Sequence, residues 1–303
     1  MDHKNIAVFG LGSMGMGIAR SCVQAGLKTF GFDTNEDVVT NFTSFGGEVS
    51  TPIDQIANDL DIVIIVVVNA DQMNSILIDS PGLINSLKPG SVVVACPTVT
   101  PEYAKTIEAT LESRNIFYLD SPISGGSAKA NQGALTIMAA GKLQAFDAAK
   151  PVLDAISETV YKLGDHAGPG SAMKVVNQLL AGVHIAAAAE AITFGIGQGI
   201  EAARILDVIS DCAGTSWMFE NRGKHIVDGD YTPHSSVEIF VKDLGIVNDI
   251  ARDSRSYTPL ASAALQEFLA ASGSGIGHED DSAVAKVYAR NSSINLPGQL
   301  KTK

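Results

Sequence analysis

The chain is short of basic residues and of charged residues in general. Lysine and arginine number 21 against 33 aspartates and glutamates, which gives a formal net charge of −12 over 303 residues. This deficit excludes a protein that binds nucleic acid by displacing counterions from phosphates, and one that docks on an anionic membrane. Charged residues make up only 18% of the chain and hydrophobic residues 46%, so the composition also excludes long-range disorder.

Cysteines, clustered histidines and long apolar runs are also scarce. Cys22, Cys96 and Cys212 are too few and too widely spaced for a disulfide framework or a zinc cluster, which predicts reduced thiols. The six histidines show no metal-ligand spacing, so no metal site is predicted. The longest aliphatic run, Ile62–Val68, is far shorter than a bilayer span, and no signal or transit pattern opens the sequence. We expect a soluble, cytoplasmic protein with no membrane or nucleic-acid partner.

The first half of the chain alternates short apolar runs with segments of helical period. One run, Ile62–Val68, has no polar alternation, which is typical of a strand buried on both faces of a parallel sheet. Helical segments such as Met14–Ala25 and Pro101–Glu112 lie between the runs. This alternation predicts an α/β domain over residues 1–164, with a doubly wound Rossmann-type sheet. The expected strands are Ile6–Phe9, Thr29–Phe32, Ile62–Val68, Val92–Cys96, Ile116–Leu119 and Leu135–Ala139.

The second half changes to helical patterns. From Ser171 to about Gly197 only Gly182 and Gly195 interrupt a helix that would be roughly 40 Å long. No run of strand period follows, so residues 165–303 are expected to form an all-α substrate and dimerisation domain, joined by this long central helix. The four alanines Ala186–Ala189 permit close helix packing. That composition suits a homodimer or a homotetramer, and it equally suits a core helix of a single chain.

A glycine-rich loop directly follows the first expected strand. The pattern G-x-G-x-x-G between a strand and a helix is typical of dinucleotide binding. Gly10 allows the tight turn, Gly12 lets the backbone approach a pyrophosphate, and Gly15 lets the helix pack on the strand. The alternative is a chance glycine-rich turn, which the flanking strands disfavour. The residues predicted to form this cofactor loop are Gly10, Leu11, Gly12, Ser13, Met14 and Gly15.

Asp33 supports the same prediction. It follows the second expected strand and lies 21 residues after Gly12. A carboxylate there accepts hydrogen bonds from ribose hydroxyls and repels a 2′-phosphate. The sequence therefore favours NAD over NADP.

Three other patterns each allow two interpretations, a functional site or an ordinary structural feature. Ser124–Gly126 follows the fifth strand and offers backbone N–H groups to a carboxylate, or forms an ordinary turn. Lys174, Asn177 and Gln178 share one face of the long helix, which lines a site or faces solvent. Lys242 lies on an amphipathic segment, where it reaches a site or is a solvated lysine.

Taken together, the motifs resemble the β-hydroxyacid dehydrogenase family, which includes 3-hydroxyisobutyrate dehydrogenase, tartronate semialdehyde reductase and 6-phosphogluconate dehydrogenase. The resemblance covers nearly the whole chain, with the motifs in the family's order. It implies an NAD-dependent dehydrogenase acting on a small hydroxy acid. The motifs are Phe9–Gly15, Asp120–Gly126, Gly168–Gln178 and Lys242–Leu244.

The resemblance also implies roles for individual residues. Lys174 would be the catalytic acid–base. Substrate binding would fall to Ser124, Gly125, Gly126, Asn177 and Gln178. Thr98 would contact the nicotinamide half of the cofactor, and Lys242 would reach the site near the nicotinamide. Val68 and Asn69 would also bind the cofactor.

Three stretches resemble the branch of the family that oxidises L-threonate. The branch converts this four-carbon sugar acid to its 2-oxo acid with NAD. The alternative is reduction of tartronate semialdehyde, or another 3-hydroxyacid dehydrogenase. A non-catalytic nucleotide-binding module is disfavoured, because Lys174 is present and the chain is acidic. The stretches are Lys174–His184, Ser216–Arg222 and Ile239–Gly245.

Overall fold

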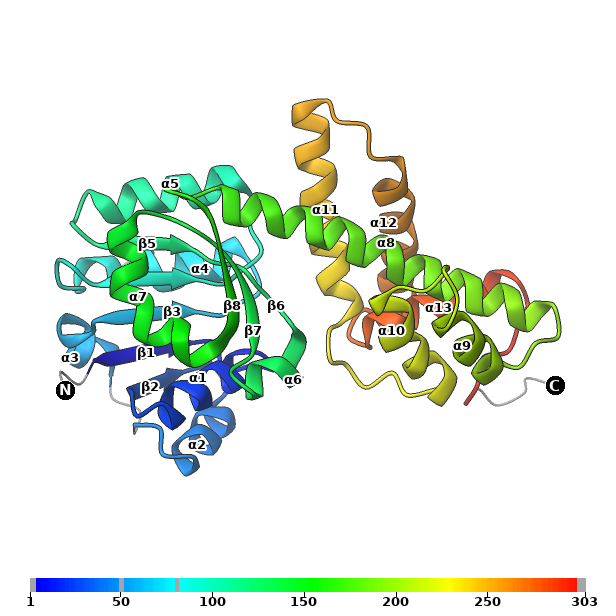
Figure 1. Ribbon diagram of the computed structural model, residues 1–303, viewed down its shortest axis with the longest axis horizontal. Coiled ribbons are helices and arrows are strands. Elements are labelled where there is room, and N and C mark those ends of the chain that lie inside the picture. Colours follow the sequence, from blue (N-terminus) through cyan, green and yellow to red (C-terminus); the bar gives the residue numbers. More distant parts are fainter. Residues whose placement is uncertain (1–3, 49–51, 80–81, 299–303) are drawn as a thin grey trace. The chain divides into compact units, whose positions relative to one another are not determined.

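The computed structural model describes residues 4–48, 52–79 and 82–298, and Figure 1 shows its ribbon. The chain divides into two compact units, Met1–Lys174 and Val175–Lys303. The division falls inside one long helix, whereas the sequence predicts a domain boundary after Gly164. That boundary stays a prediction.

The first unit contains a single eight-stranded sheet. The order is β2-β1-β3-β4-β5-β7-β6, and β8 pairs with β7. The strands β2-β1-β3-β4-β5 are parallel, as expected, whereas β7 runs antiparallel to β5 and β6. The strands are β1 Asn5–Phe9, β2 Lys28–Phe32, β3 Ile62–Ile65, β4 Val92–Ala95, β5 Phe117–Asp120, β6 Ile123–Ser124, β7 Leu135–Ala140 and β8 Ser157–Gly164.

Helices cover both faces of this sheet. Alternate residues of β3 enter two different cores: Ile62 and Ile64 pack with α1 and α7, whereas Val63 and Ile65 pack with α4 and α5. This double burial explains why the run lacks polar alternation. The helices are α1 Gly15–Gln24, α2 Glu36–Ser44, α3 Ile53–Ile56, α4 Ala70–Leu77, α5 Pro101–Glu112, α6 Gly126–Asn131 and α7 Leu143–Ile156.

The sequence analysis did not predict two of the strands, and the reasons are physical. Strand β6 has only two residues, and most of β8 is partly or fully exposed, so neither contains a buried apolar run. The expected strand Ile62–Val68 ends at Ile65, because the chain leaves the sheet there and the Val68 side chain is exposed.

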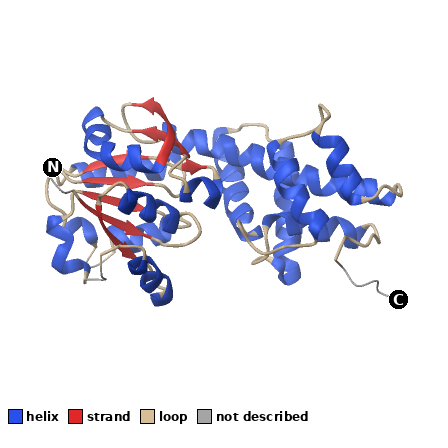
Figure 2. Ribbon diagram, turned by 60° about the horizontal axis from the view of Figure 1, so that its bottom comes forward, coloured by secondary structure: helices blue, strands red, loops and turns tan. Residues whose placement is uncertain are grey.

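In the described part of the second unit the elements are helices, apart from an isolated bridge between Ser236 and Asp280. Figure 2 shows the contrast: the strands (red) belong to the first unit. The prediction of a Rossmann-type domain followed by helices is therefore confirmed. The helices are α8 Pro169–Gly197, which begins in the first unit, α9 Ala202–Ser210, α10 Trp217–Asp228, α11 Val237–Ser254, α12 Pro259–Ala271 and α13 Ala285–Asn291.

The two glycines inside α8 are contact points for other helices. A Cβ atom on Gly182 would lie 2.9 Å from the Leu244 side chain of α11, and one on Gly195 would lie 2.5 Å from Ile205 of α9. Glycine therefore lets these helices approach α8 closely. By length and composition α8 is apolar enough to cross a membrane, but half of its apolar window is buried within the protein.

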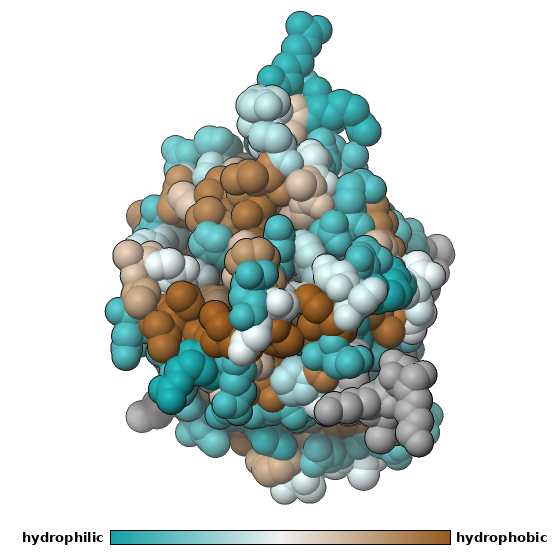
Figure 3. Space-filling view, turned by 90° about the vertical axis from the view of Figure 1, so that its right-hand side faces the viewer, coloured by the Kyte–Doolittle hydropathy of each residue, from teal (hydrophilic) through white to brown (hydrophobic). Residues whose placement is uncertain are grey.

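Large apolar side chains are also exposed on the second unit. They include Phe194 near the end of α8, Val208 of α9, Tyr257 between α11 and α12, and Leu260 of α12. Figure 3 shows apolar residues gathered on one face of the molecule.

Candidate active site

The glycine loop has two positions that admit only glycine. Gly10 has φ +89°, and a Cβ there would lie 2.5 Å from the carbonyl oxygen of Val66. A Cβ on Gly15, the first residue of α1, would lie 1.8 Å from the carbonyl oxygen of Gly10. The tight turn and the close packing of helix on strand are thus both present.

Gly12 is different, because its surroundings are open. Apart from Gly12 itself and its chain neighbours, no heavy atom of the described residues lies within 4 Å of a Cβ built there. The first bond of α1 runs from the Met16 N–H to the Gly12 carbonyl at 3.0 Å, so the N–H groups just before Met16 lie at the helix start, where they have no intrahelical partner. Space and donors together fit the pyrophosphate of a dinucleotide.

The Asp33 carboxylate lies against this loop. Its Oδ2 accepts the Leu11 N–H at 2.7 Å, and its Oδ1 accepts the Asn35 N–H at 2.9 Å. A carboxylate has about four lone-pair sites, so each oxygen keeps one after these two contacts. Asp33 thus holds the loop and keeps acceptors for ribose hydroxyls.

Three more predicted cofactor residues lie at the same edge of the sheet. Val68 and Asn69 follow β3, and Thr98 follows the neighbouring β4. Asn69 caps α4, because its Oδ1 accepts the Gln72 N–H at 2.9 Å. Parallel strands end together, so these residues share the carboxyl edge of the sheet with the glycine loop, where such folds bind ligands.

The first unit brings Lys174 beside the predicted carboxylate cradle. The Lys174 side chain is buried, and its Nζ donates to the carbonyl oxygen of Ile123 at 2.9 Å. Ser124 follows directly, and the turn continues through Gly125 at φ +132° and Gly126 at φ +68°, conformations that favour glycine. An ammonium group and a glycine turn thus meet at one place.

A buried carboxylate fixes this arrangement. Asp120 ends β5; its Oδ1 accepts the Ser171 hydroxyl at 2.6 Å, and its Oδ2 accepts the N–H groups of Gly168 and Ser171, both at 2.9 Å. Burial raises the pKa of the Asp120 carboxyl, and the bonds from Ser171 and Gly168 oppose that shift. Asp120 therefore anchors the start of α8, and the Ser171 that it binds lies less than one turn before Lys174.

Sequence reasoning assigned no role to Asp120 or Ser171. The available signal was an acid at a strand end, followed later by Gly168–Ser171 at a helix start. Nothing local in the sequence pairs two residues that lie 51 positions apart.

In the second unit, the other predicted residues form a hydrogen-bonded chain. The Asn177 Nδ2 donates to the Gln178 Oε1 at 2.9 Å, and the Gln178 Nε2 donates to the Asp243 Oδ2. The Lys242 Nζ donates to the other oxygen, Oδ1, of Asp243 at 2.5 Å. Asp243 is buried and was assigned no role by the sequence analysis.

Cysteine and metal chemistry find no support in the described residues. Cys22, Cys96 and Cys212 are free, and burial raises the pKa of the Cys22 and Cys96 thiols to about 12. Thiols with so high a pKa are poor nucleophiles. Within residues 4–48, 52–79 and 82–298, no cluster of three or more His, Cys, Asp or Glu side chains is arranged to hold a metal ion.

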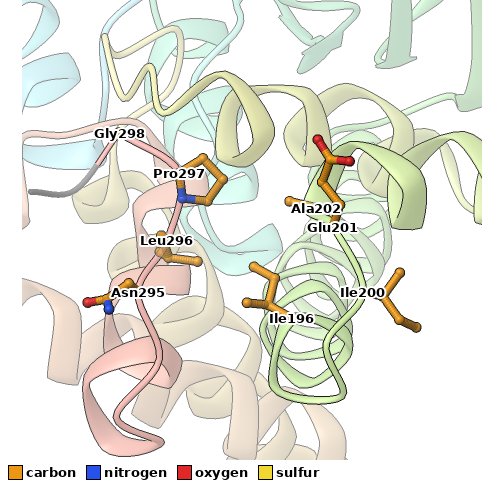
Figure 4. Close-up of a pocket in the computed structure, with 8 residues that line it drawn as sticks. All are labelled: Ile196, Ile200, Glu201, Ala202, Asn295, Leu296, Pro297 and Gly298. Atoms are coloured by element: carbon orange, nitrogen blue, oxygen red, sulfur yellow. The ribbon is translucent and has the colours of Figure 1, made fainter. Parts of the chain in front are cut away.

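A pocket of about 310 Å³ in the second unit is separate from these residues. Figure 4 shows its lining, which comes from Ile196, Ile200 and Glu201 around the end of α8 and from the segment 295–298. The lining is mostly apolar and contains no lysine or arginine, so it does not suit a carboxylate or a pyrophosphate. The glycine loop and the Lys174 region remain the candidate site.

Fold and loop together define a nicotinamide-dependent oxidoreductase. Residues 5–164 match the family model for the NAD-binding domain of 6-phosphogluconate dehydrogenase. Residues 168–288 match the model described as NAD-binding of NADP-dependent 3-hydroxyisobutyrate dehydrogenase. The chain belongs to the β-hydroxyacid dehydrogenase family, and it is a dehydrogenase that uses a nicotinamide cofactor.

Curated relatives and a solved structure agree with this family. The chain is 48% identical to L-threonate dehydrogenase of Pectobacterium atrosepticum, over 96% of this chain and 95% of the relative. It is 47% identical to L-threonate dehydrogenase of Haemophilus influenzae, over 98% and 99%. A crystal structure described as 3-hydroxyisobutyrate dehydrogenase from Salmonella typhimurium is 48% identical, with a TM-score of 0.90 over 94% of this chain and 99% of that one.

Proposed function

We propose that this protein oxidises L-threonate to 2-oxo-tetronate with NAD⁺. The observation that carries the chemistry is the Lys174 ammonium, 2.9 Å from the Ile123 carbonyl and directly beside the Ser124–Gly126 turn. The similarity to L-threonate dehydrogenases along nearly the whole chain supports the choice of substrate.

The mechanism assigns a step to each part of the site. The N–H groups and hydroxyl of Ser124–Gly126 hold the substrate carboxylate, which places the neighbouring hydroxyl at Lys174. A bound nicotinamide would supply the acceptor for the hydride from carbon 2. The neutral amine of Lys174 accepts the hydroxyl proton as the C–O bond becomes a carbonyl, and its ammonium returns a proton in the reverse reaction.

Residues on both sides of Lys174 complete the proposal. Asn177 and Gln178 bind the remaining substrate hydroxyls. On the cofactor side, the glycine loop and Asp33 hold the adenosine and pyrophosphate. Thr98 and Lys242 would bind the nicotinamide half, and Val68 and Asn69 would also hold the cofactor. We assign residues 1–164 to cofactor binding and 165–303 to substrate binding and dimerisation.

We expect NAD⁺ to be preferred over NADP⁺ by at least about tenfold in kcat/KM, a difference of about 1.4 kcal/mol. The reason is that a 2′-phosphate would meet the Asp33 carboxylate, which the Leu11 and Asn35 N–H groups hold in place. Asp33→Ser should lower the ratio of kcat/KM with NAD⁺ to kcat/KM with NADP⁺, because it weakens the binding of NAD⁺. Equal kcat/KM values for both cofactors in the unmodified enzyme would refute this role of Asp33.

The substrate is tested by kcat/KM for L-threonate, D-glycerate and 3-hydroxyisobutyrate with NAD⁺, followed by NADH absorbance. A site that hydrogen-bonds several hydroxyls disfavours analogues without them, since its polar groups are left unpaired. We therefore expect L-threonate to exceed both others by about tenfold or more. A tenfold advantage of D-glycerate would instead support the three-carbon reductase, and one of 3-hydroxyisobutyrate would support the activity for which the Salmonella structure is named.

We further propose a cytoplasmic homodimer or homotetramer with no membrane or nucleic-acid partner. The net charge of −12 supports the lack of an anionic partner. The exposed apolar side chains of Phe194, Val208 and Leu260 support self-association through the second unit.

A further inference from the structure

Asp243 joins two of the side chains assigned to substrate and cofactor in the second unit. One carboxylate oxygen accepts from Lys242 and the other from Gln178. We propose that Asp243 is a positioning residue, which sets the direction of the Gln178 and Asn177 amides and holds the Lys242 ammonium. The inference deepens the proposed function and rests on it.

The carboxylate of Asp243 fixes the direction of the hydrogen bonds that link it to Gln178 and Asn177. A carboxylate only accepts hydrogen bonds, so Gln178 must turn its NH₂ group toward Asp243. The Gln178 carbonyl oxygen then faces Asn177, which donates its own NH₂ to it at 2.9 Å. Asn177 therefore keeps its carbonyl oxygen as an acceptor for a hydroxyl group. Through Gln178, Asp243 thus determines that Asn177 offers a hydrogen-bond acceptor to a substrate.

The close packing of α8 and α11 brings Asp243 within hydrogen-bonding distance of Gln178. Asp243 lies on α11 and Gln178 on α8, 65 positions apart in sequence. The neighbouring Leu244 side chain packs where Gly182 lacks a side chain, which brings α11 close to α8. Because the Asp243 side chain is only 1% exposed, its charge depends on these partners rather than on water.

Asp243→Asn is the main test. An asparagine of the same size gives up one acceptor, so Gln178 or Lys242 loses its fixed partner. We expect KM for the hydroxy acid to rise about tenfold with a smaller change in kcat, which corresponds to the loss of one well-formed hydrogen bond.

A matched control separates positioning from stability. Asp281 is another buried carboxylate of the same unit and pairs with Arg222 at 2.5 Å. Asp281→Asn should lower Tm and leave KM of the folded enzyme within about twofold, since it loses a structural ion pair only. If Asp243→Asn lowers Tm but leaves KM unchanged, as expected of the control, Asp243 is merely structural and the proposal is wrong.

A second variant tests the direction of the chain without any assay of activity. Asn177→Asp puts an acceptor against the Gln178 carbonyl and forces that amide to turn, so that its oxygen faces Asp243. With Asp243→Asn added, the introduced asparagine donates to the turned Gln178 and the whole chain reverses. We therefore expect Asp243→Asn to lower Tm in the unmodified protein and to raise it in the Asn177→Asp background. A Tm loss of the same size in both backgrounds would overturn the proposal.

The kinetic arm uses whichever C3–C4 hydroxy acid the unmodified enzyme oxidises fastest. If L-threonate is not oxidised, the proposed substrate fails, whereas the KM and Tm results on Asp243 still stand. If Asp243→Asn does not fold alone, the double variant Asn177→Asp with Asp243→Asn still tests the direction of these hydrogen bonds: recovery of folding in the double variant supports the proposal, and no recovery contradicts it.

Discussion

Alanine in place of Lys174 is expected to lower kcat by about 10²–10⁴-fold, the usual range for a lost acid–base group. The Lys174 amine is a buried titratable group that the structure places beside the Ser124–Gly126 turn. Without it, the substrate hydroxyl has no positioned group to take its proton. NAD⁺ affinity should change little, because Lys174 is remote in sequence and role from the glycine loop.

The control for Lys174→Ala is Lys150→Ala. Lys150 lies exposed on α7 of the same unit and pairs with Asp154 at 2.7 Å. Exposed pairs of this kind contribute little to stability, so its kcat, Tm and NAD⁺ affinity should all match those of the unmodified enzyme. Retention of more than a tenth of kcat in Lys174→Ala would mean that another group carries the proton.

Alanine in place of Gly12 is expected to weaken NAD⁺ binding by about 100-fold, or about 2.7 kcal/mol. The added methyl group occupies the open space at the start of α1 that the pyrophosphate needs. Because no described atom lies within 4 Å of that Cβ, folding should be unaffected. Titration calorimetry with NAD⁺ and thermal unfolding together measure the two effects.

Gly15→Ala provides the contrast. Its Cβ would lie 1.8 Å from the Gly10 carbonyl oxygen, so the helix or the turn must move. We expect Tm to fall by about 5 °C or more, whereas Gly12→Ala leaves it unchanged. Unchanged NAD⁺ affinity in Gly12→Ala would show that the cofactor does not bind at this loop.

The sequence predicts those features that depend on local patterns. The continuous apolar run at Ile62–Ile65, the spacing of the glycines in the loop and the long segment of α8 with few helix breakers are all local patterns, so each element could be recognised. The strand–helix alternation of the first half and the helical second half followed from the same kind of pattern.

The features that the sequence analysis missed depend on contacts between distant positions. Strand β8 is stabilised by its pairing with β7 and has no buried run of its own. Asp120 meets Ser171, and Asp243 meets Gln178, only after the chain has folded. In both cases a buried acid accepts a hydrogen bond from a residue of α8, and no spacing rule reveals such a partner.

The most direct test of the proposed function follows the hydrogen at carbon 2. The enzyme is incubated with NAD⁺ and L-threonate that carries deuterium at carbon 2, and the reduced cofactor and the organic product are analysed by mass spectrometry. The account predicts that deuterium is recovered in the reduced cofactor and that the product is 2-oxo-tetronate without the label. Unlabelled reduced cofactor, with deuterium retained at carbon 2 of the product, would contradict it.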